Sequence, residues 1–363
     1  MFMQSNGGLT DAELFQGKDA ILSGPAGGVV GMTRTAAMSG YTKLIGFDMG
    51  GTSTDVTHYA GEFERSFETE VAGVRMRAPM MHIHTVAAGG GSVLQFDGAR
   101  FRVGPESAGA NPGPACYRRG GPLAVTDCNV MLGKLQPEDF PKLFGANSDE
   151  ALDREIVREK FSTLAVEIEA KTGIKQQAEE VAAGFLAVAV QNMANAVKKI
   201  SVQRGYDVTE YTLCCFGGAG GQHACLVADS LAMKRILIHP YAGVLSAYGM
   251  GLADTVVARQ RAVEAVLTSS SHVSLAESFD QLQQDGIVEL RRQGEDRAEL
   301  ECKHLLHIRY QGSDTAIVVR QSMLADVISQ FEHLHQMRFG FISPQKEMIV
   351  ESIEVEVIAA AES

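Results

Sequence analysis

Apolar and polar residues alternate along the first part of the chain in a pattern that predicts short strands and helices joined by glycine-rich turns. Residues 29–38 have a spacing compatible with a helix that Gly40 ends, and residues 44–47 form a short apolar run typical of a buried strand. Glycine and proline concentrate in residues 85–92, which predict a tight turn, and in residues 104–114, which predict an irregular loop. We therefore expect a mixed α/β fold.

Two long helices are predicted in the middle of the chain. From Ser148 onward Glu, Lys, Ala and Val become frequent, and apolar residues recur at helical spacing over residues 150–172 and 176–203. In the second stretch Ala and Val fall on one face, with the polar Gln191 and Asn192 among them. We expect that face to be buried.

A β-turn-α-β unit is predicted after these helices. Its strand, glycine turn, helix and second strand are expected at residues 211–216, 217–221, 222–232 and 236–239. The turn lies between a strand and a helix, where backbone N–H groups can meet a ligand.

The last part of the chain begins with a polar stretch, residues 268–272, which predicts a linker. A helix is expected directly beyond it, followed by a pair of strands around residues 311–312. A second helix is expected at residues 323–336 and an alternating strand at residues 348–358. We therefore predict two domains, residues 1–267 and a small α/β domain of residues 268–363.

Composition narrows the class of protein. The 363 residues, 45% hydrophobic and 21% charged, suit a globular chain with two cores. A formal net charge of −12 argues against a nucleic-acid partner, which would need clustered Lys and Arg. The 6 cysteines are scattered without a C-x-x-C pair, so we expect no disulfide framework and a reduced, cytoplasmic setting. No stretch approaches the roughly 18 apolar residues of a membrane span, and the start lacks an export signal, so we predict neither export nor a membrane anchor.

The segment Asp48-Met-Gly-Gly-Thr-Ser-Thr-Asp55 has the chemistry of a phosphate-binding loop. Its glycines let backbone N–H groups approach an anion and its hydroxyls add donors, so the expected nucleotide contacts are Gly50, Gly51, Thr52, Ser53 and Thr54. Asp48 and Asp55 would repel a bare phosphate, so the pair makes sense as a catalytic site only with a divalent cation or a water between them and the nucleotide, and Mg²⁺ is the expected cation. The alternative is a glycine hairpin whose hydroxyls cap its own backbone.

A second glycine motif covers residues 216–223. A dinucleotide-binding motif would need a different glycine spacing and an acidic residue after the next strand, which residues 236–240 do not supply. A turn that contacts adenosine fits better, and a plain tight turn is the alternative. The residues expected to contact the nucleotide are Gly217, Gly218, Ala219, Gly220 and Gly221.

A scattered set of side chains has the chemistry of Zn²⁺ or Mn²⁺ ligands. Its members are His84, Cys116, Asp127 and His223, with His82 predicted to share a strand face with His84. The spacing is not diagnostic, and for each residue taken singly a satisfied core or surface position is favoured over a metal ligand by roughly two to one. Cys116 could instead be a nucleophile. The remaining histidines, His304, His307, His333 and His335 among them, are expected at the surface.

With these motifs the sequence resembles the hydantoinase A and 5-oxoprolinase family. The similar blocks are residues 22–30, 46–55, 85–92, 103–117, 126–127 and the turn at Gly217, and they extend over nearly the whole chain. Residues 83–85, 111–114, 127–133 and 239–250 are most similar to the 5-oxoprolinase branch. The resemblance implies an α/β fold of the actin-like ATPase (ribonuclease H-like) class.

The resemblance also implies a reaction, the ATP-driven opening of 5-oxo-L-proline to L-glutamate with release of ADP and phosphate. A five-membered lactam is a poor electrophile, and phosphorylation of its amide oxygen would create a leaving group before water attacks. Asp48 and Asp55 would then organise the cation and phosphates, and residues 217–221 would hold the adenosine.

One departure from the family pattern concerns the partners. The family has an earlier lobe with another phosphate loop, which nothing before Asp48 supplies, and a hydantoinase B-type region, which does not appear before Ser363. We therefore expect a fragment or one piece of a split enzyme, inactive alone, that works with these missing parts as a homo-oligomer.

Two other functions stay open. The nearest keeps the fold and changes the substrate, as in an ATP-dependent hydantoinase A or an acetone carboxylase-like subunit. The other is a non-catalytic, nucleotide-dependent interaction module, because this class of fold also serves binding and motion.

Overall fold

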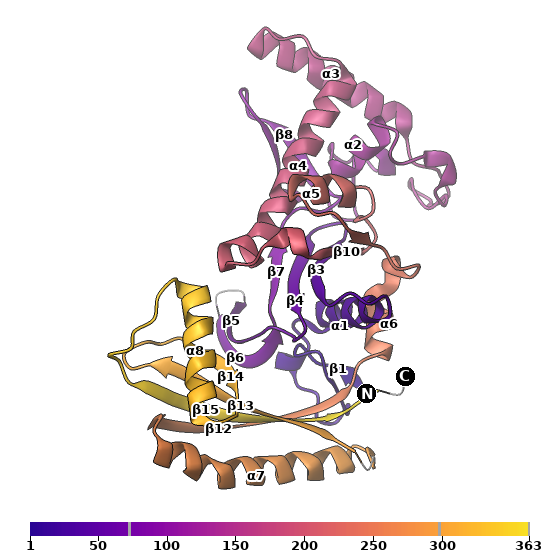
Figure 1. Ribbon diagram of the computed structural model, residues 1–363. Coiled ribbons are helices and arrows are strands. Elements are labelled where there is room, and N and C mark those ends of the chain that lie inside the picture. Colours follow the sequence, from indigo (N-terminus) through magenta and orange to yellow (C-terminus); the bar gives the residue numbers. More distant parts are fainter. Residues whose placement is uncertain (72–73, 297–298, 362–363) are drawn as a thin grey trace. The chain divides into compact units, whose positions relative to one another are not determined.

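The computed structural model describes residues 1–71, 74–296 and 299–361 as a mixed α/β protein. The chain forms two compact units (Figure 1). Unit 1 comprises Met1–Val30, Ser66–Met81 and Gly249–Ser363, and unit 2 comprises Gly31–Arg65 and His82–Tyr248. The helix α1 (Ser23–Met38) contributes residues to both.

Unit 1 is built on a six-stranded sheet. The strand order is β1 (Phe2–Met3), β2 (Leu9–Thr10), β12 (Thr255–Val266), β15 (Met348–Ala359), β13 (Glu301–Tyr310) and β14 (Ile317–Arg320). The long strands β12, β15 and β13 are antiparallel to one another. The same unit contains η1 (Gly17–Asp19) and the strands β5 (Arg65–Val71) and β6 (Val74–Met81).

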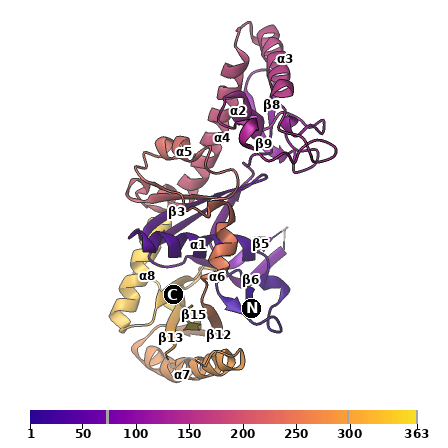
Figure 2. The ribbon, with the colours of Figure 1, turned by 90° about the vertical axis from the view of Figure 1, so that its right-hand side faces the viewer.

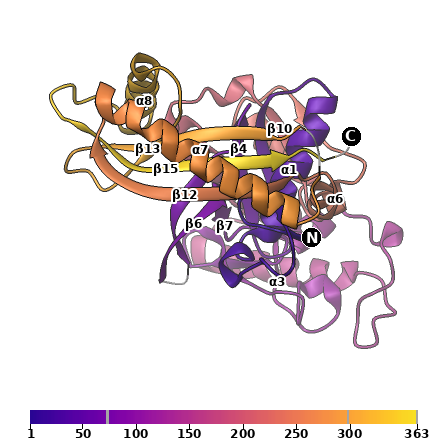
Figure 3. The same cartoon turned by 90° about the horizontal axis from the view of Figure 1, so that it is seen from below.

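The core of unit 1 lies between this sheet and two helices. Alternate residues of β15, such as Val355 and Val357, are buried in one cluster with Phe279 of α7 (Ser269–Arg292). Figure 3 shows α7 lying along β12, β13 and β15. The helix α8 (Leu324–Phe339) contacts β14 and contributes Phe331 to the cluster.

Unit 2 contains a five-stranded sheet with a mixed arrangement. The strand order is β11 (Ile236–Leu237), β10 (Thr212–Phe216), β3 (Lys43–Met49), β4 (Thr54–Ala60) and β7 (Ile83–Val86). The strands β11, β10 and β3 are parallel, whereas β4 is antiparallel to both β3 and β7. The carboxyl ends of β3 and β10 therefore meet at one edge of the sheet.

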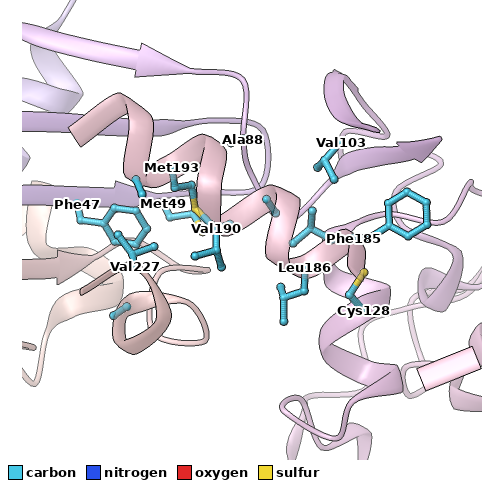
Figure 4. Packing of buried hydrophobic residues seen from close by; sticks show 14 of the residues in the cluster. Phe47, Met49, Ala88, Val103, Cys128, Phe185, Leu186, Val190, Met193 and Val227 are labelled. Atoms are coloured by element: carbon cyan, nitrogen blue, oxygen red, sulfur yellow. The ribbon is translucent and has the colours of Figure 1, made fainter. Parts of the chain in front are cut away.

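The helix α4 (Ala178–Ile200) is the centre of the unit 2 core. Met193 lies on the side of Phe47 and Met49, and Phe185 lies towards Val103 and Cys128 (Figure 4). Smaller elements gather at the start of α4 (Figure 2). They are β8 (Ser92–Phe96), β9 (Phe101–Ser107), α2 (Val125–Met131) and α3 (Arg154–Thr172). Other helices of the unit are α5 (Ala224–Ser230) and η6 (Ala242–Val244), and α6 (Leu245–Gly251) contributes residues to both units.

Among the described residues one helix, α4 with the turn after it (Ala178–Arg204), is long and apolar enough to cross a membrane by length and composition alone. We expected no stretch of this kind. Its apolar residues belong to the core cluster of unit 2, and 56% of its most apolar window is buried inside the protein. A buried core helix accounts for the same composition.

Several predicted elements are confirmed with shifted ends, and others are wrong. The two long central helices and the β-turn-α-β unit are present as α3, α4, β10, α5 and β11. The irregular loop predicted over residues 104–114 is partly wrong, because β9 continues to Ser107. The helix expected at residue 29 begins at Ser23 and takes in Pro25, whose missing N–H is tolerated in a first turn.

The predicted linker at residues 268–272 is also wrong. The Thr268 hydroxyl accepts a hydrogen bond from the Ser271 backbone N–H at 3.1 Å and caps α7, so these hydroxyl residues begin a helix. The two compact units are also divided differently from the predicted domains, since residues 1–30 group with residues 249–363. The predicted domain boundary between residues 267 and 268 stays a prediction.

Two histidines expected at the surface are buried. His307 is 3% exposed, and its Nε2 lies 2.9 Å from Oε2 of Glu354, which is itself buried in β15. His335 bonds through Nδ1 to the Phe341 carbonyl oxygen at 2.7 Å. Both residues form structural hydrogen bonds inside unit 1.

A test of the unit 1 core uses Gly286 of α7. A Cβ added there would lie 2.6 Å from Cγ2 of Val357, so α7 approaches β15 as closely as it does only because residue 286 has no side chain. We predict that Gly286→Val lowers the free energy of unfolding by about 2 kcal/mol relative to Gln284→Val, through overpacking. Gln284 is exposed on the same helix, so Gln284→Val controls for the presence of a β-branched residue in α7. Equal urea midpoints for the two variants would contradict the packing described here.

Candidate functional site

Asp48 and Asp55 lie opposite each other at the end of a hairpin. They are direct partners in the antiparallel pairing of β3 and β4, so their side chains project from the same face of the sheet. The turn between them is closed by a hydrogen bond from the Gly50 N–H to the Ser53 carbonyl oxygen, 3.0 Å long. The sequence pattern predicted this strand, turn and strand correctly.

The surroundings of Asp48 and Asp55 disfavour the charged form of both carboxyl groups. Burial, and next the neighbouring charge of Asp55, raises the pKa of Asp48 to about 6. Burial also raises the pKa of Asp55, against a hydrogen bond from the Thr85 hydroxyl to Oδ1 of Asp55 at 2.6 Å. Neither carboxylate forms an ion pair within the part of the chain that the structure describes, so a divalent cation would relieve their repulsion.

A second backbone segment, residues 88–91, holds the turn from one side. The N–H groups of Gly90 and Gly91 donate to the carbonyl oxygens of Gly50 and Gly51 at 3.1 and 2.6 Å. A Cβ added to Gly89 would lie only 2.6 Å from the Thr52 carbonyl carbon, so this approach requires glycine. We call residues 88–91 the brace.

The brace also engages one of the predicted phosphate donors. Thr54 is fully buried, and its hydroxyl donates to the Ala88 carbonyl oxygen at 2.5 Å. It is therefore not available to a ligand as predicted. The hydroxyls of Thr52 and Ser53 have no hydrogen-bond partner among the described residues, and both side chains reach solvent.

The helix α2 anchors the brace. Thr126 donates to the Gly90 carbonyl oxygen through both its N–H and its hydroxyl, each at 2.8 Å. The next residue, Asp127, is fully buried and accepts hydrogen bonds from the N–H groups of Ala115, Cys116 and Ala124 at 3.0, 2.8 and 2.8 Å. Asp127 thus ties the short helix η2 (Ala115–Tyr117), which follows the loop of residues 104–114, to the start of α2.

The second glycine turn lies beside Asp48. Phe216 and Asp48 are partners in the parallel pairing of β10 and β3, and the Ala219 N–H donates to the Met49 carbonyl oxygen at 2.9 Å. Gly217 has a φ of +83°, and a Cβ added there would lie 2.4 Å from Oδ1 of Asp48. The predicted nucleotide-binding segments therefore meet at one edge of the sheet, as their positions after parallel strands require.

An open pocket of ≈ 500 Å³ lies beside this turn. Its lining residues include Lys134, Leu135, Phe216, Gly217, Gly218, Gly221, Gln222, Ile238, Ala242 and Gly243. Of the predicted adenosine contacts, Ala219 and Gly220 do not line it, and a Cβ on Gly220 would meet the Phe216 carbonyl oxygen at 2.8 Å.

Some glycines of the site have no structural reason to be glycine. A Cβ added to Gly51, Gly218, Gly221 or Gly243 would meet no atom within 4 Å, and none of these residues has a positive φ. Larger side chains at these positions would instead fill open space beside the turns.

The residues predicted as metal ligands are only partly brought together. Cys116 and Asp127 are in contact, whereas His223 lies 3.2 Å from the Asn129 amide and His84 lies on β7. No group of three His, Cys, Asp or Glu side chains that could hold a metal ion occurs among the described residues. His82 lies outside β7 rather than on its face, with Nδ1 3.6 Å from Oε2 of Glu64.

The pKa shifts of Cys116 and His223 do not favour a catalytic role for either side chain. Burial, and next the Asp127 carboxylate, raises the pKa of the Cys116 thiol well above its ordinary range, so the thiolate of a nucleophile is disfavoured. Burial, and next Lys134, lowers the pKa of His223 to about 4. Both side chains fit structural roles in the core.

Sequence reasoning gave no roles to the brace, Thr85, Thr126, Lys134 or Ile238. The brace was visible as a glycine-rich turn at residues 85–92, but nothing in its composition named Gly50 and Gly51 as its partners. Lys134 and Ile238 have no motif of their own and reach the pocket only through the tertiary fold.

Comparison with known proteins agrees with the motifs. A family model described as Hydantoinase/oxoprolinase matches residues 1–259. The chain is 44% identical over 362 residues to a 5-oxoprolinase of Saccharomyces cerevisiae, covering 98% of the chain and 28% of that protein. It is 40% identical over 375 residues to a 5-oxoprolinase of Dictyostelium discoideum, covering 99% of the chain and 30% of that protein. The chain thus spans less than a third of these relatives.

Two solved structures share the fold. The ATP-dependent caprolactamase from Pseudomonas jessenii superposes with a TM-score of 0.86 at 31% identity, over 99% of this chain and 53% of that one. A nucleotide-free acetone carboxylase superposes with a TM-score of 0.71 at 20% identity, over 98% of this chain and 52% of that one, a likeness of fold alone. On the family match over residues 1–259 and these identities, the chain belongs to the hydantoinase/oxoprolinase family.

Proposed function

We propose that this chain provides one ATP-binding lobe of an enzyme that hydrolyses 5-oxo-L-proline to L-glutamate with release of ADP and phosphate. One observation carries the proposal. The Asp48–Asp55 pair, the two glycine turns and the ≈ 500 Å³ pocket lie at the same edge of one sheet, where the carboxyl ends of parallel strands commonly bind ligands. The actin-like ATPase class expected for the fold is part of the same proposal.

The residues at this edge fit a nucleotide and a divalent cation. Asp48 and Asp55 would hold Mg²⁺, because the two carboxylates lie side by side and neither has a cationic partner among the described residues. Burial raises the pKa of both groups, and the charge of Asp55 adds to the rise at Asp48. The backbone at Gly51 and the hydroxyls of Thr52 and Ser53 would contact phosphate oxygens. Gly217, Gly218 and Gly221 would contact the adenosine.

The chemistry of the lactam explains why ATP and the residues of this chain would have different roles. When bound, ATP would supply the phosphoryl group that turns the amide oxygen into a leaving group. The residues of this chain would position the phosphates and neutralise their charge through the cation, which is the main protein contribution in phosphoryl transfer. The brace would keep the turn rigid while it does so.

The relatives favour a five-membered lactam over other substrates. Identity is 40% and 44% to the two 5-oxoprolinases and 31% to the caprolactamase. We propose that the activity also requires the remaining regions of such enzymes, a second phosphate loop and a hydantoinase B-type part. Hydantoin opening and nucleotide-dependent binding without catalysis are the alternatives, and ADP release with 5-oxoproline but not hydantoin would exclude both.

Replacement of Asp48 tests the catalytic assignment. In the complete enzyme that contains this chain, Asp48→Asn should lower glutamate formation by at least about a hundredfold, because it removes a charged cation ligand. The matched control is Asp97→Asn, which removes a carboxylate from an exposed turn outside this edge. Glutamate formation should be measured at saturating ATP and Mg²⁺, and full turnover by Asp48→Asn would contradict the role given to Asp48.

The same substitution should have a pH-dependent effect on stability. Asp48 has a folded pKa of about 6 against an ordinary 3.8, so its contribution to stability is present below pH 3.8 and is lost as the pH rises through 6. Without added metal, Asp48→Asn should therefore become more stable than the wild type by about 2 kcal/mol at pH 7.5, and not at pH 4. Urea unfolding at both pH values measures this.

Asp97→Asn provides the opposite sign in the same experiment. Hydrogen bonds from the N–H groups of Arg100 and Ala99 hold the pKa of Asp97 to about 2, so its stabilisation is present above its ordinary pKa and lost in acid. Asp97→Asn should be less stable than the wild type at pH 7.5. A pH-independent effect of Asp48→Asn would show that Asp48 is not electrostatically strained.

Two glycine substitutions separate ligand binding from folding. Gly51→Ala places a methyl group in open space, so it should leave the thermal midpoint within about 2 °C of the wild type while ATP binding weakens at least about tenfold. Gly89→Ala forces the brace away from Thr52 and should lower both stability and binding. Calorimetric ATP titration and thermal melts measure both. Undiminished ATP binding by Gly51→Ala would remove the phosphate loop from the proposal.

A further inference from the structure

Asp48, Asp55 and Thr85 form one row across three neighbouring strands. Asp48 of β3 is the direct partner of Asp55 in β4, and Asp55 is the direct partner of Thr85 in β7. Residues that pair directly in adjacent antiparallel strands project their side chains from the same face of a sheet. Thr85 is exposed and both aspartates are partly exposed, so a cation from solvent can reach the row.

The Thr85 hydroxyl occupies one of the two carboxylate oxygens of Asp55. It donates to Oδ1 of Asp55 at 2.6 Å, whereas Oδ2 of Asp55 has no hydrogen-bond partner among the described residues. A short hydrogen bond to a charged group is strong and restricts the rotation of the carboxylate. Asp55 therefore presents one oxygen, rather than two, to a cation or to a water bound to it.

Asp48 is held in place in a different way. Its side chain accepts no hydrogen bond within the part of the chain that the structure describes. A Cβ added to Gly217 would lie 2.4 Å from Oδ1 of Asp48, so this carboxylate packs closely against the glycine backbone. Of the two described carboxylates, Asp55 is thus the one whose orientation depends on the hydroxyl of another residue.

The segment that carries Thr85 is itself fixed to β4. The hydroxyl of Thr54 donates to the carbonyl oxygen of Ala88, and the hydroxyl of Thr85 donates to Asp55. Two consecutive residues of β4 are therefore bound to the same short segment, residues 85–88. This keeps the Thr85 hydroxyl beside the carboxylate that it orients.

We propose that Thr85 is a positioning residue that makes the cation site selective for Mg²⁺ over Ca²⁺. Mg²⁺ is small, requires near-ideal octahedral geometry and keeps several waters, so a single fixed carboxylate oxygen suits it. Ca²⁺ takes about six to eight oxygens and often binds both oxygens of one carboxylate. The bond from Thr85 withholds one oxygen of Asp55 and so disfavours Ca²⁺. This assignment rests on the proposed function in one respect, that Asp48 and Asp55 hold a cation.

Calorimetric titration of Mg²⁺ and of Ca²⁺ into the nucleotide-free complete enzyme tests the assignment. The titrations are run at pH 8, above the pKa of about 6 of Asp48, and the binding that Asp48→Asn removes identifies this site. Thr85→Val keeps the shape of the side chain and removes the hydroxyl, so it should weaken Mg²⁺ binding by about tenfold and leave Ca²⁺ binding unchanged or stronger. Thr85→Ser keeps the hydroxyl and should retain the wild-type ratio of the two dissociation constants.

Thr209→Val is the matched control. In η5 (Val208–Glu210) the Thr209 hydroxyl donates to Oδ1 of Asp207 at 2.7 Å, a bond of the same kind that lies before the start of β10, at the opposite end of the sheet from Asp48. Its removal should change neither dissociation constant.

Two outcomes contradict different claims. A Mg²⁺ to Ca²⁺ ratio in Thr85→Val equal to that of the wild type would overturn the selectivity assigned to Thr85 while the cation site stands. Cation binding that is the same in the wild type and in Asp48→Asn, or absent from both, would instead overturn the proposed cation site and this assignment with it.

Discussion

The close contact between two glycine backbones sets the geometry of the whole site. The N–H groups of Gly90 and Gly91 bond to the carbonyl oxygens of Gly50 and Gly51, and no side chain fits between the segments at Gly89. Through Thr126 the same contact continues to α2, and through Asp127 it reaches the N–H groups of Ala115 and Cys116. The turn between β3 and β4 is thereby held against the helical part of its unit, and the phosphate site that we propose needs such support.

The paired carboxylates at this turn lower stability in the absence of a cation. Asp48 and Asp55 are partly buried side by side, and the fold gives them hydroxyl and backbone neighbours but no described ion pair. Because the pair does not stabilise the fold at neutral pH, its presence supports the cation site that we propose here. The same reasoning applies to Gly51, Gly218 and Gly221, which are glycine at positions where the fold would accept a larger residue. Electrostatic strain and unfilled space at one sheet edge together argue for a charged ligand there.

Local sequence patterns correctly predicted the elements that are determined by residues close together in the chain. The strand carrying Asp48, the turn after it, the long helices and the glycine turn at Gly217 follow from apolar spacing and glycine position. The sequence could not show which distant groups satisfy a polar side chain. Thr54 was expected to bind phosphate and bonds to Ala88, Asp127 was expected to bind metal and holds three N–H groups, and His307 was expected at the surface and pairs with Glu354. The linker predicted from Thr268 onward was wrong for a different reason, because hydroxyl residues are typical of linkers and of helix caps alike.

A structure of the complete enzyme with a non-hydrolysable ATP analogue and Mg²⁺ is the most direct measurement of the central claim. The account predicts a cation bound at Asp48 and Asp55, phosphates against Gly51, and the base in the pocket lined by Gly218, Gln222 and Ile238. A nucleotide bound elsewhere, with Asp48 and Asp55 remote from both cation and phosphate, would contradict it.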